Sequence, residues 1–195
     1  MEGDQLTKNL VASSALMTLL AGIIQKWIIP AHWEHAPAHG LFFLLVGIVQ
    51  IIWGIAVWRH PSTRLYYIGV LMAGWLIVLY GITRWLPAPF GHGPEAIRTI
   101  DVACKLCEGL AMLTLIILIF QGLFLSAGRM VAQRAIILIV IFSIIAGFST
   151  YGLACAAEPL FPSLSAPAEE HYHDEGTSAE DHHHVEVTPM PEHDH

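Results

Sequence analysis

Charged residues are scarce over most of this chain. They make up 13% of its 195 residues, while 55% are hydrophobic, a balance too apolar for an ordinary soluble domain. Lys and Arg are missing altogether from residues 158–195, although this segment holds ten of the sixteen acidic residues and seven of the twelve histidines. The formal net charge of −7 therefore belongs to the C-terminal segment and not to the apolar remainder.

Motifs of common catalysts are also missing. The sequence has no P-loop, no HExxH pair and no nucleophile elbow. No histidine stands deep within an apolar run, which argues against a b-type haem clamped between helices. Enzymatic function therefore has little support, and nothing indicates a nucleic-acid partner.

Five apolar runs each approach the roughly 20 residues that a helix needs to cross a bilayer. Most lack the alternating pattern of a membrane β-barrel, and backbone groups in lipid must be satisfied within helices. We therefore predict an all-α, polytopic membrane bundle of five transmembrane helices in residues 1–157, followed by a disordered, acidic, histidine-rich tail in residues 158–195. The first run is expected to be a retained anchor. Glycines at five positions are expected where helices approach closely. The runs cover residues 10–29, 40–58, 65–86, 97–127 and 135–157, and the glycines are Gly69, Gly74, Gly81, Gly109 and Gly147.

Basic residues in short loops predict the orientation of such a bundle. Five of them fall on one side if the spans alternate, and that side should be cytoplasmic. The N-terminus would then be cytoplasmic and the tail extracytoplasmic, in a multi-pass protein of the plasma membrane. The five are Lys8, Arg59, Arg64, Arg129 and Arg134.

This orientation gathers eleven of the twelve histidines on the outer face, with only His60 on the other side. Imidazole is the commonest borderline metal ligand and binds when neutral. We expect an ordered acceptor site near the first and second outer loops and an ion-capturing tail. Capture remains one interpretation of the tail, and a merely solubilising, pH-responsive segment is the other. The expected ligands are His32, Glu34, His35, His39 and His92 in the ordered site, and His171, His173, His182, His183, His184, His193 and His195 in the tail. Copper, zinc, nickel and cobalt all remain open.

The fourth run opens with ionisable residues at helical spacing. Arg98, Asp101, Lys105 and Glu108 fall on one helix face. They either pair internally and tie the helix to its neighbours, or offer Asp101 and Glu108 as ligands or proton acceptors on a path from the outer face. The candidate pathway residues are Gln50, Asp101, Cys104, Cys107, Glu108 and Cys155. The cysteines are open to three interpretations: small packing residues, thiolate ligands of Cu(I), or a disulfide.

The stretches IPAHWEH, GLFFLLVGIVQIIWG and PFGHGPEAIRTIDVACKLCE resemble a group of uncharacterised bacterial multi-span membrane proteins. The resemblance covers roughly residues 25–120 and implies a membrane fold without naming an activity. His35, His39 and the cysteine pair are not part of the shared pattern. The matching positions are Pro30, His32, Gly40, Phe42, Phe43, Gln50, Pro89, Phe90, Gly91, Pro94, Glu95, Asp101 and Glu108.

The sequence thus predicts an integral membrane protein that binds transition-metal ions at its extracytoplasmic face, in metal uptake, efflux or buffering. One alternative is a non-catalytic accessory subunit of a respiratory-type membrane complex, with other membrane subunits as partners. A second alternative is a membrane oxidoreductase linked to quinone or haem. The lipid bilayer and metal ions are the expected partners of the first hypothesis.

Overall fold

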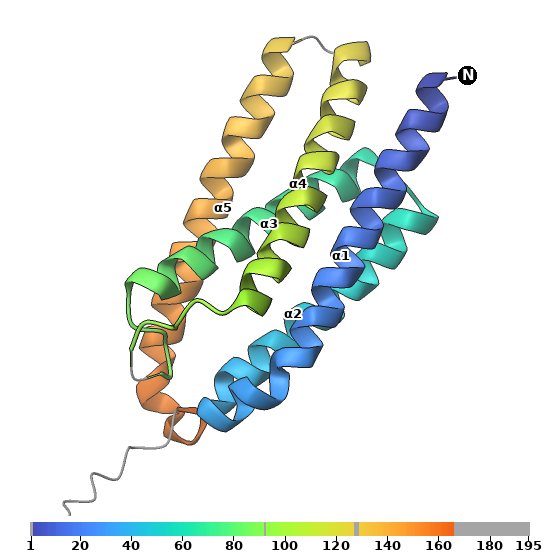
Figure 1. Cartoon of the computed structure of the whole chain (residues 1–195). Helices are drawn as coiled ribbons and strands as arrows, with labels where there is room; N and C mark the ends of the chain where they lie inside the picture. The colour runs from blue at the N-terminus through green and yellow to red at the C-terminus, as the bar shows by residue number, and fades with distance from the viewer. Residues whose placement is uncertain (1, 92, 127–128, 166–195) are drawn as a thin grey trace, which may run out of the picture.

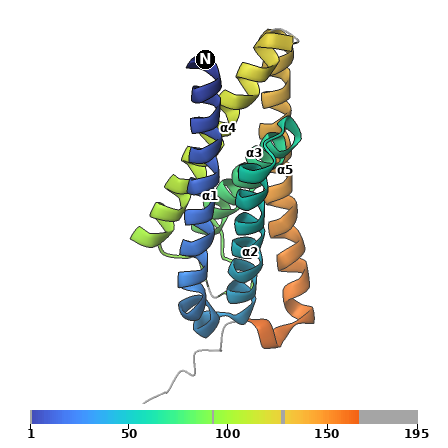
Figure 2. The ribbon, with the colours of Figure 1, turned by 90° about the vertical axis from the view of Figure 1, so that its right-hand side faces the viewer.

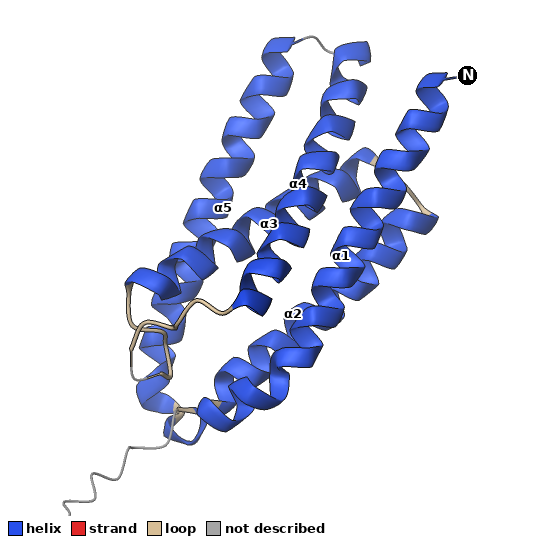
Figure 3. Cartoon of the chain, viewed as in Figure 1, coloured by secondary structure: helices blue, strands red, loops and turns tan. Residues whose placement is uncertain are grey.

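The computed structural model describes residues 2–91, 93–126 and 129–165, and the regular elements in these ranges are all helical (Figure 3). Each of the five long helices includes a stretch long and apolar enough to cross a membrane. The all-α, five-helix prediction is therefore confirmed. The helices are α1 (Glu2–His35), α2 (Pro37–Arg59), α3 (Thr63–Trp85), α4 (Thr99–Ser126) and α5 (Arg129–Ala157).

The boundaries differ from the prediction at two places. The first helix does not end before Pro30 but continues to His35, with the proline inside it. After α5, the first residues of the predicted tail form two 3-10 turns, η1 (Glu158–Leu160) and η2 (Pro162–Leu164), each with a proline at its start. The rest of the predicted tail, from residue 166, lies outside the described residues.

The connections alternate between the two ends of the bundle (Figures 1 and 2). The α1–α2 turn, the loop between α3 and α4 and the end of α5 lie at one end, far from the N-terminus. We call this the turn end. The start of α1, the end of α4 and the start of α5 lie at the opposite end. An odd number of passes therefore brings the C-terminal part of the described chain beside the α1–α2 turn.

The helices do not pack equally against one another. α1 and α2 form a close pair in which Gly22 and Gly47 face each other, since a Cβ at Gly22 would lie 2.9 Å from the carbonyl oxygen of Gly47. α4 packs against α1 and α3, and α3 packs against α5. α2 has few contacts with α3, and in the described residues it does not pack against α5. Side chains of α3 bridge α2 and α5 instead, since Trp75 contacts Phe42 of α2 and donates a hydrogen bond to Thr150 of α5.

Three of the five glycines that were expected where helices approach closely do face a neighbouring helix. Gly69 meets Trp53, Gly74 meets Ser143 and Gly147 meets Val78. For Gly81 and Gly109 the prediction is wrong, because no neighbouring atom lies within 4 Å of a Cβ built at either position.

The two halves of the bundle have different interiors. The half that includes the N-terminus is filled by apolar side chains from α1, α2, α3 and α4: Val11, Ala15, Trp53, Val57, Val70, Leu115, Leu118 and Ile119. Buried glutamines and ionisable side chains lie toward the turn end instead: Gln25, His32, Gln50, Asp101 and Glu108. The buried hydroxyls of Ser14 and Thr18, nearer the N-terminus, donate to carbonyl oxygens of their own helix. Among the described residues, the buried ionisable groups therefore lie in the half of the bundle that includes the turn end.

Candidate functional site

A single residue separates the first two helices and brings two histidines close together. Ala36 is extended, with φ −154° and ψ 115°, because a following proline disfavours the helical conformation. Pro37 then opens α2, a position where its missing N–H costs nothing. His32 consequently lies in the last turns of α1 and His39 in the first turn of α2, with ring centroids 6.3 Å apart.

The α3–α4 loop, residues 86–98, is held over these histidines by contacts from three helices. Nε2 of His39 lies 2.6 Å from the carbonyl oxygen of Pro89, and the Tyr151 hydroxyl donates to the carbonyl oxygen of Pro87 at 2.8 Å. The backbone N–H of Glu95 donates to Thr83 of α3 at 3.0 Å. These contacts bring the Glu95 carboxylate to the histidine pair.

His32, His39 and Glu95 form a compact ligand group, which we call the outer cluster. One ligand atom from each lies within 4.8 Å of the other two, and Nδ1 of His39 is 3.3 Å from Oε1 of Glu95. Two ligands of a tetrahedral zinc ion at about 2.1 Å are about 3.4 Å apart. The distance between Nδ1 of His39 and Oε1 of Glu95 therefore suits two ligands of one metal ion.

The hydrogen bond to Pro89 fixes how His39 faces Glu95. A carbonyl oxygen can only accept, so Nε2 of His39 carries a proton and, in the neutral ring, Nδ1 offers a lone pair. That lone pair points at a carboxylate oxygen, and two acceptors at this distance require a cation or proton between them. His32 is 7% exposed, and its Nε2 has no hydrogen-bond partner among the described residues.

Glu95 shares its closest permanent cation with a second carboxylate. Arg84 contacts Glu95 at 2.6 Å and Asp101 at 3.2 Å, while Glu108 has its own partner in Lys105 at 2.6 Å. The charge of the exposed Arg98 also acts on His32. Glu95 therefore has no cationic side chain to itself among the ion pairs of the described residues.

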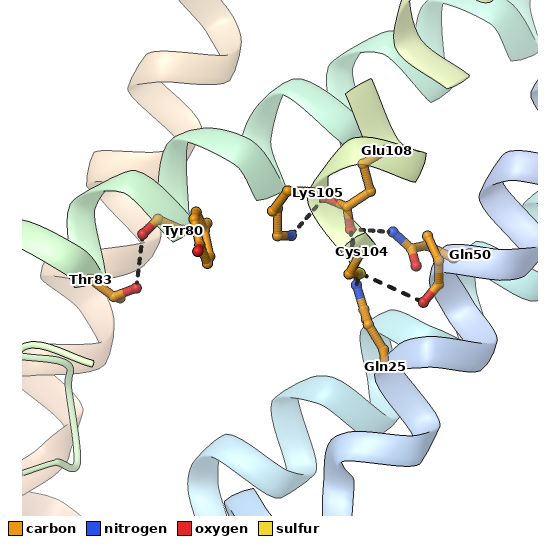
Figure 4. Close-up of polar contacts among 8 residues, drawn as sticks. Gln25, Gln50, Tyr80, Thr83, Cys104, Lys105 and Glu108 are labelled. Atoms are coloured by element: carbon orange, nitrogen blue, oxygen red, sulfur yellow. Dashed lines mark hydrogen bonds and ion pairs between the residues drawn. The ribbon is translucent and has the colours of Figure 1, made fainter. Parts of the chain in front are cut away.

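Glu108 is the centre of a second, deeper cluster, shown in Figure 4. It is 2% exposed, and its Oε1 accepts hydrogen bonds from Gln25 of α1 at 3.0 Å and Gln50 of α2 at 2.9 Å. The Cys104 thiol lies 3.8 Å from the same oxygen. We call these residues, with Lys105, the inner cluster. It ties α1 and α2 to α4 in the middle of the bundle.

A cavity of about 240 Å³ connects the two clusters. His39 and Glu95 line it on the outer side, and Asp101, Cys104 and Lys105 line it on the inner side. α1, α2, α3 and α5 complete its wall with mainly apolar side chains. The cavity is therefore an apolar chamber with ionisable groups at both ends.

The structure brings together part of the predicted acceptor site. His32 and His39 meet, but Glu34 is exposed on α1 and the carboxylate at the cluster is Glu95. The side chain of His35 lies outside the described part of the chain. So do His92 and the seven tail histidines, for which the prediction stays as it was.

The predicted pathway residues separate into two groups. Gln50, Cys104 and Glu108 meet in the inner cluster, whereas Asp101 contacts Arg84 of α3. The predicted pairing along α4 is correct for Lys105, which forms an ion pair with Glu108. It is wrong for Asp101 and Arg98, because Arg98 precedes the helix and is exposed.

The cysteines do not pair. Cys104 is buried, Cys107 and Cys155 are partly buried, and all three are free thiols. The disulfide interpretation therefore does not describe this structure, and Cys155 on α5 is no member of either cluster. Cys104 alone contacts ionisable groups of the inner cluster.

Three residues of the site were missed from the sequence. Glu95 was named only among the positions that carry the resemblance, and Gln25 and Arg84 were given no role. Gln25 and Gln50 are both polar residues inside apolar runs, so the same signal that selected Gln50 could have selected Gln25. Arg84 was visible as an unpaired charge at the end of the third run.

Comparison of the chain with protein-family models, with curated proteins and with solved structures finds no match in any of the three. The functional argument therefore comes from the geometry and chemistry of the two clusters.

Proposed function

We propose that this chain is a multi-pass membrane protein that binds a transition-metal ion at the extracytoplasmic end of its helix bundle. The N-terminus lies in the cytoplasm, and the turn end, with the outer cluster and the tail, faces outward from the plasma membrane. Metal uptake, efflux or buffering would each use such a site.

Membrane insertion is supported by the outer surface of α5. Its exposed side chains are large and apolar over several turns: Ile137, Leu138, Val140, Ile141, Phe142, Ile144, Ile145, Phe148 and Leu153. A soluble protein rarely exposes a patch of this size. The basic residues Lys8, Arg59, Arg64 and Arg134 stand near the end opposite the outer cluster, which supports the proposed orientation.

The observation that carries the metal proposal is the outer cluster itself. Two imidazoles and one carboxylate converge from three segments, and Glu95 shares Arg84 with Asp101. Buried ionisable groups are normally paired or bound to a metal. A cation held by His32, His39 and Glu95 would balance the Glu95 carboxylate and use the unpartnered imidazole nitrogen.

The tail would bind metal ions and deliver them to the outer cluster. Its segments HYHDE, EDHHHVE and EHDH combine imidazole with carboxylate, which is typical of metal-binding tracts. The described chain ends at Ser165, directly after η2, which contacts α2. Only five residues separate this point from His171. Tail histidines can therefore reach the outer cluster.

Metal content measured in matched full-length variants tests the proposal. The seven tail histidines are changed to Asn in one variant, so that the outer cluster is tested without the tail. After loading with Zn²⁺ or Cu²⁺ and gel filtration, we expect about one ion per chain by elemental analysis. Adding His39→Ala should abolish binding, while Glu34→Gln serves as the control and should retain it.

Two results would contradict the proposal. If the variant without tail histidines binds no metal, the ordered site does not exist. Co-purification of other membrane subunits would then favour the accessory-subunit alternative. Metal retention in the His39→Ala variant would place the ion elsewhere.

A further inference from the structure

The cavity between the two clusters is larger and more apolar than a metal ion requires. Its walls carry Phe42 and Phe43 from α2, Tyr80 from α3 and Phe90 from the loop. Aromatic faces of this kind bind flat rings by stacking or edge contacts. A concave apolar chamber with a few convergent polar groups is the usual form of a small-molecule site.

Phe90 adds a second, independent indication. Among the described residues it is the only non-glycine residue with a positive φ, at 62°. Such a conformation costs about 1–2 kcal/mol for a side chain of this type, and strain of this sort concentrates at ligand clamps. Here it places an aromatic ring on the wall of the cavity, held there by the contacts of the loop with His39 and Tyr151.

Two helices of the cavity wall do not pack directly against each other. α2 and α5 both line the cavity, but they do not pack against each other in the described residues. In a membrane, the space between them would face lipid. A ligand that reaches the cavity this way must be soluble in the bilayer.

The polar groups further restrict what the ligand can be. Asp101 and Lys105 both line the cavity and are one helical turn apart, about 6 Å along the α4 axis. An acceptor and a donor on the same cavity wall suit a ring with a hydroxyl group, which donates to the carboxylate, and a second oxygen, which accepts from the ammonium. Lys105 also lies 5.6 Å from the centre of the Tyr80 ring, so its charge is at the aromatic wall.

We propose that this cavity binds the ring of a membrane quinone or quinol. The ring lies among the aromatic side chains, and one ring oxygen accepts a hydrogen bond from Lys105. In the quinol form, the opposite hydroxyl donates to Asp101 or to an acceptor of the outer cluster. A cavity of about 240 Å³ holds one substituted ring and not a whole lipid, so the isoprenoid tail extends between α2 and α5. The inference rests on the membrane insertion proposed above but not on metal binding.

Titration of the full-length protein in detergent with decylubiquinone, a ring with a short alkyl tail, tests this site. The readout is quenching of Trp75, whose indole N–H donates to Thr150 at the cavity wall. We expect saturable quenching that is lost in Trp75→Phe. Ala154→Phe fills the cavity from α5 and should weaken binding at least tenfold. Leu153→Phe adds the same ring at a neighbouring residue that is 71% exposed and should leave binding unchanged.

Several outcomes would overturn the proposal. Quenching that never saturates, or equal affinity in Ala154→Phe and the parent, removes the site. Equal competition by n-decanol, which has the tail but no ring, would show a simple lipid site instead. If Ala154→Phe does not fold, Ala38→Leu fills the cavity from α2 and is judged by the same criterion. His32 is not among the residues that line the cavity. The His32→Ala variant should therefore bind decylubiquinone even if it no longer binds metal. This variant distinguishes failure of the quinone proposal from failure of the metal proposal.

Discussion

Gln50 on α2 donates a hydrogen bond of 2.9 Å to Glu108 on α4, although the two residues are 58 positions apart. Gln25 of α1 donates to the same oxygen at 3.0 Å. Lys105 completes the set through the second carboxylate oxygen, at 2.6 Å. One ionised carboxylate therefore fixes the relative position of three helices, and the walls of the cavity depend on it.

Removing the charge of Glu108 should destabilise the bundle. Glu108→Gln leaves the Lys105 ammonium without its partner, and breaking a buried ion pair in this way costs about 3–5 kcal/mol. The free energy of unfolding, measured by titration with SDS in mixed micelles, should fall by about 3 kcal/mol.

A double variant and an exposed pair serve as controls for this experiment. Glu108→Gln combined with Lys105→Met removes both charges and should recover part of the loss. Lys8→Ala breaks the Lys8–Asp4 pair, whose side chains are 66% and 70% exposed, and should change stability by less than about 0.5 kcal/mol. Equal effects of Glu108→Gln and Lys8→Ala would show that the inner cluster has no structural importance.

The close approach of α1 and α2 predicts opposite effects of the same substitution at two glycines. Gly22→Ala places a Cβ 2.9 Å from the backbone oxygen of Gly47, so the helices must move apart at a cost of about 1–3 kcal/mol. Gly109→Ala meets no atom within 4 Å, and alanine favours a helix by up to about 1 kcal/mol. Thermal unfolding of the two variants, compared with the parent, should shift in opposite directions. A Gly22→Ala protein as stable as the parent would contradict the packing of this helix pair.

Two glutamates near the turn end should differ sharply in their effect on metal affinity. Glu95→Gln removes a ligand and should weaken metal binding at least tenfold, whereas Glu34→Gln changes an exposed carboxylate outside the outer cluster and should have little effect. The comparison uses the variant without tail histidines, with dissociation constants from competition with a chromophoric chelator. Affinity in both should fall as the pH is lowered, because a protonated imidazole has no lone pair for the ion. Equal losses in the two variants would remove Glu95 from the site.

The sequence predicted the helices well because their signal is local. Apolar runs such as residues 40–58 need no knowledge of their neighbours, and α2 (Pro37–Arg59) extends this run by only a few residues. Pro37 was likewise a local signal for the break at Ala36. The extension of α1 past Pro30 was not predicted, because a proline inside a long membrane helix is tolerated when neighbouring helices support it.

The partners within the site depended on tertiary structure and were only partly predictable. His32 and His39 were selected as ligands because they are close in sequence and fall on the same side. Their carboxylate was assigned to Glu34, two residues from His32, but it comes from Glu95 in a different loop. Asp101 was expected to pair along its own helix, and it pairs with Arg84 of α3. Sequence spacing identifies residues on one helix face, and it does not say which neighbouring helix that face meets.

The proposed orientation makes a prediction for chemical labelling in intact cells. His60 directly follows α2, and Ser165 directly follows η2. The α2–α3 turn lies in the half of the bundle with the N-terminus, whereas the end of α5 lies at the turn end (Figure 1). Single cysteines introduced as His60→Cys or Ser165→Cys, in a chain whose own cysteines are replaced by Ala, are treated with a membrane-impermeant maleimide. Ser165→Cys should react in intact cells, and His60→Cys should react only after the membrane is permeabilised. Because the bundle has five long helices, these two positions must lie on opposite sides if all five cross. Labelling of both from outside would mean that one helix does not span, and the reverse pattern would place the outer cluster in the cytoplasm, away from extracellular metal.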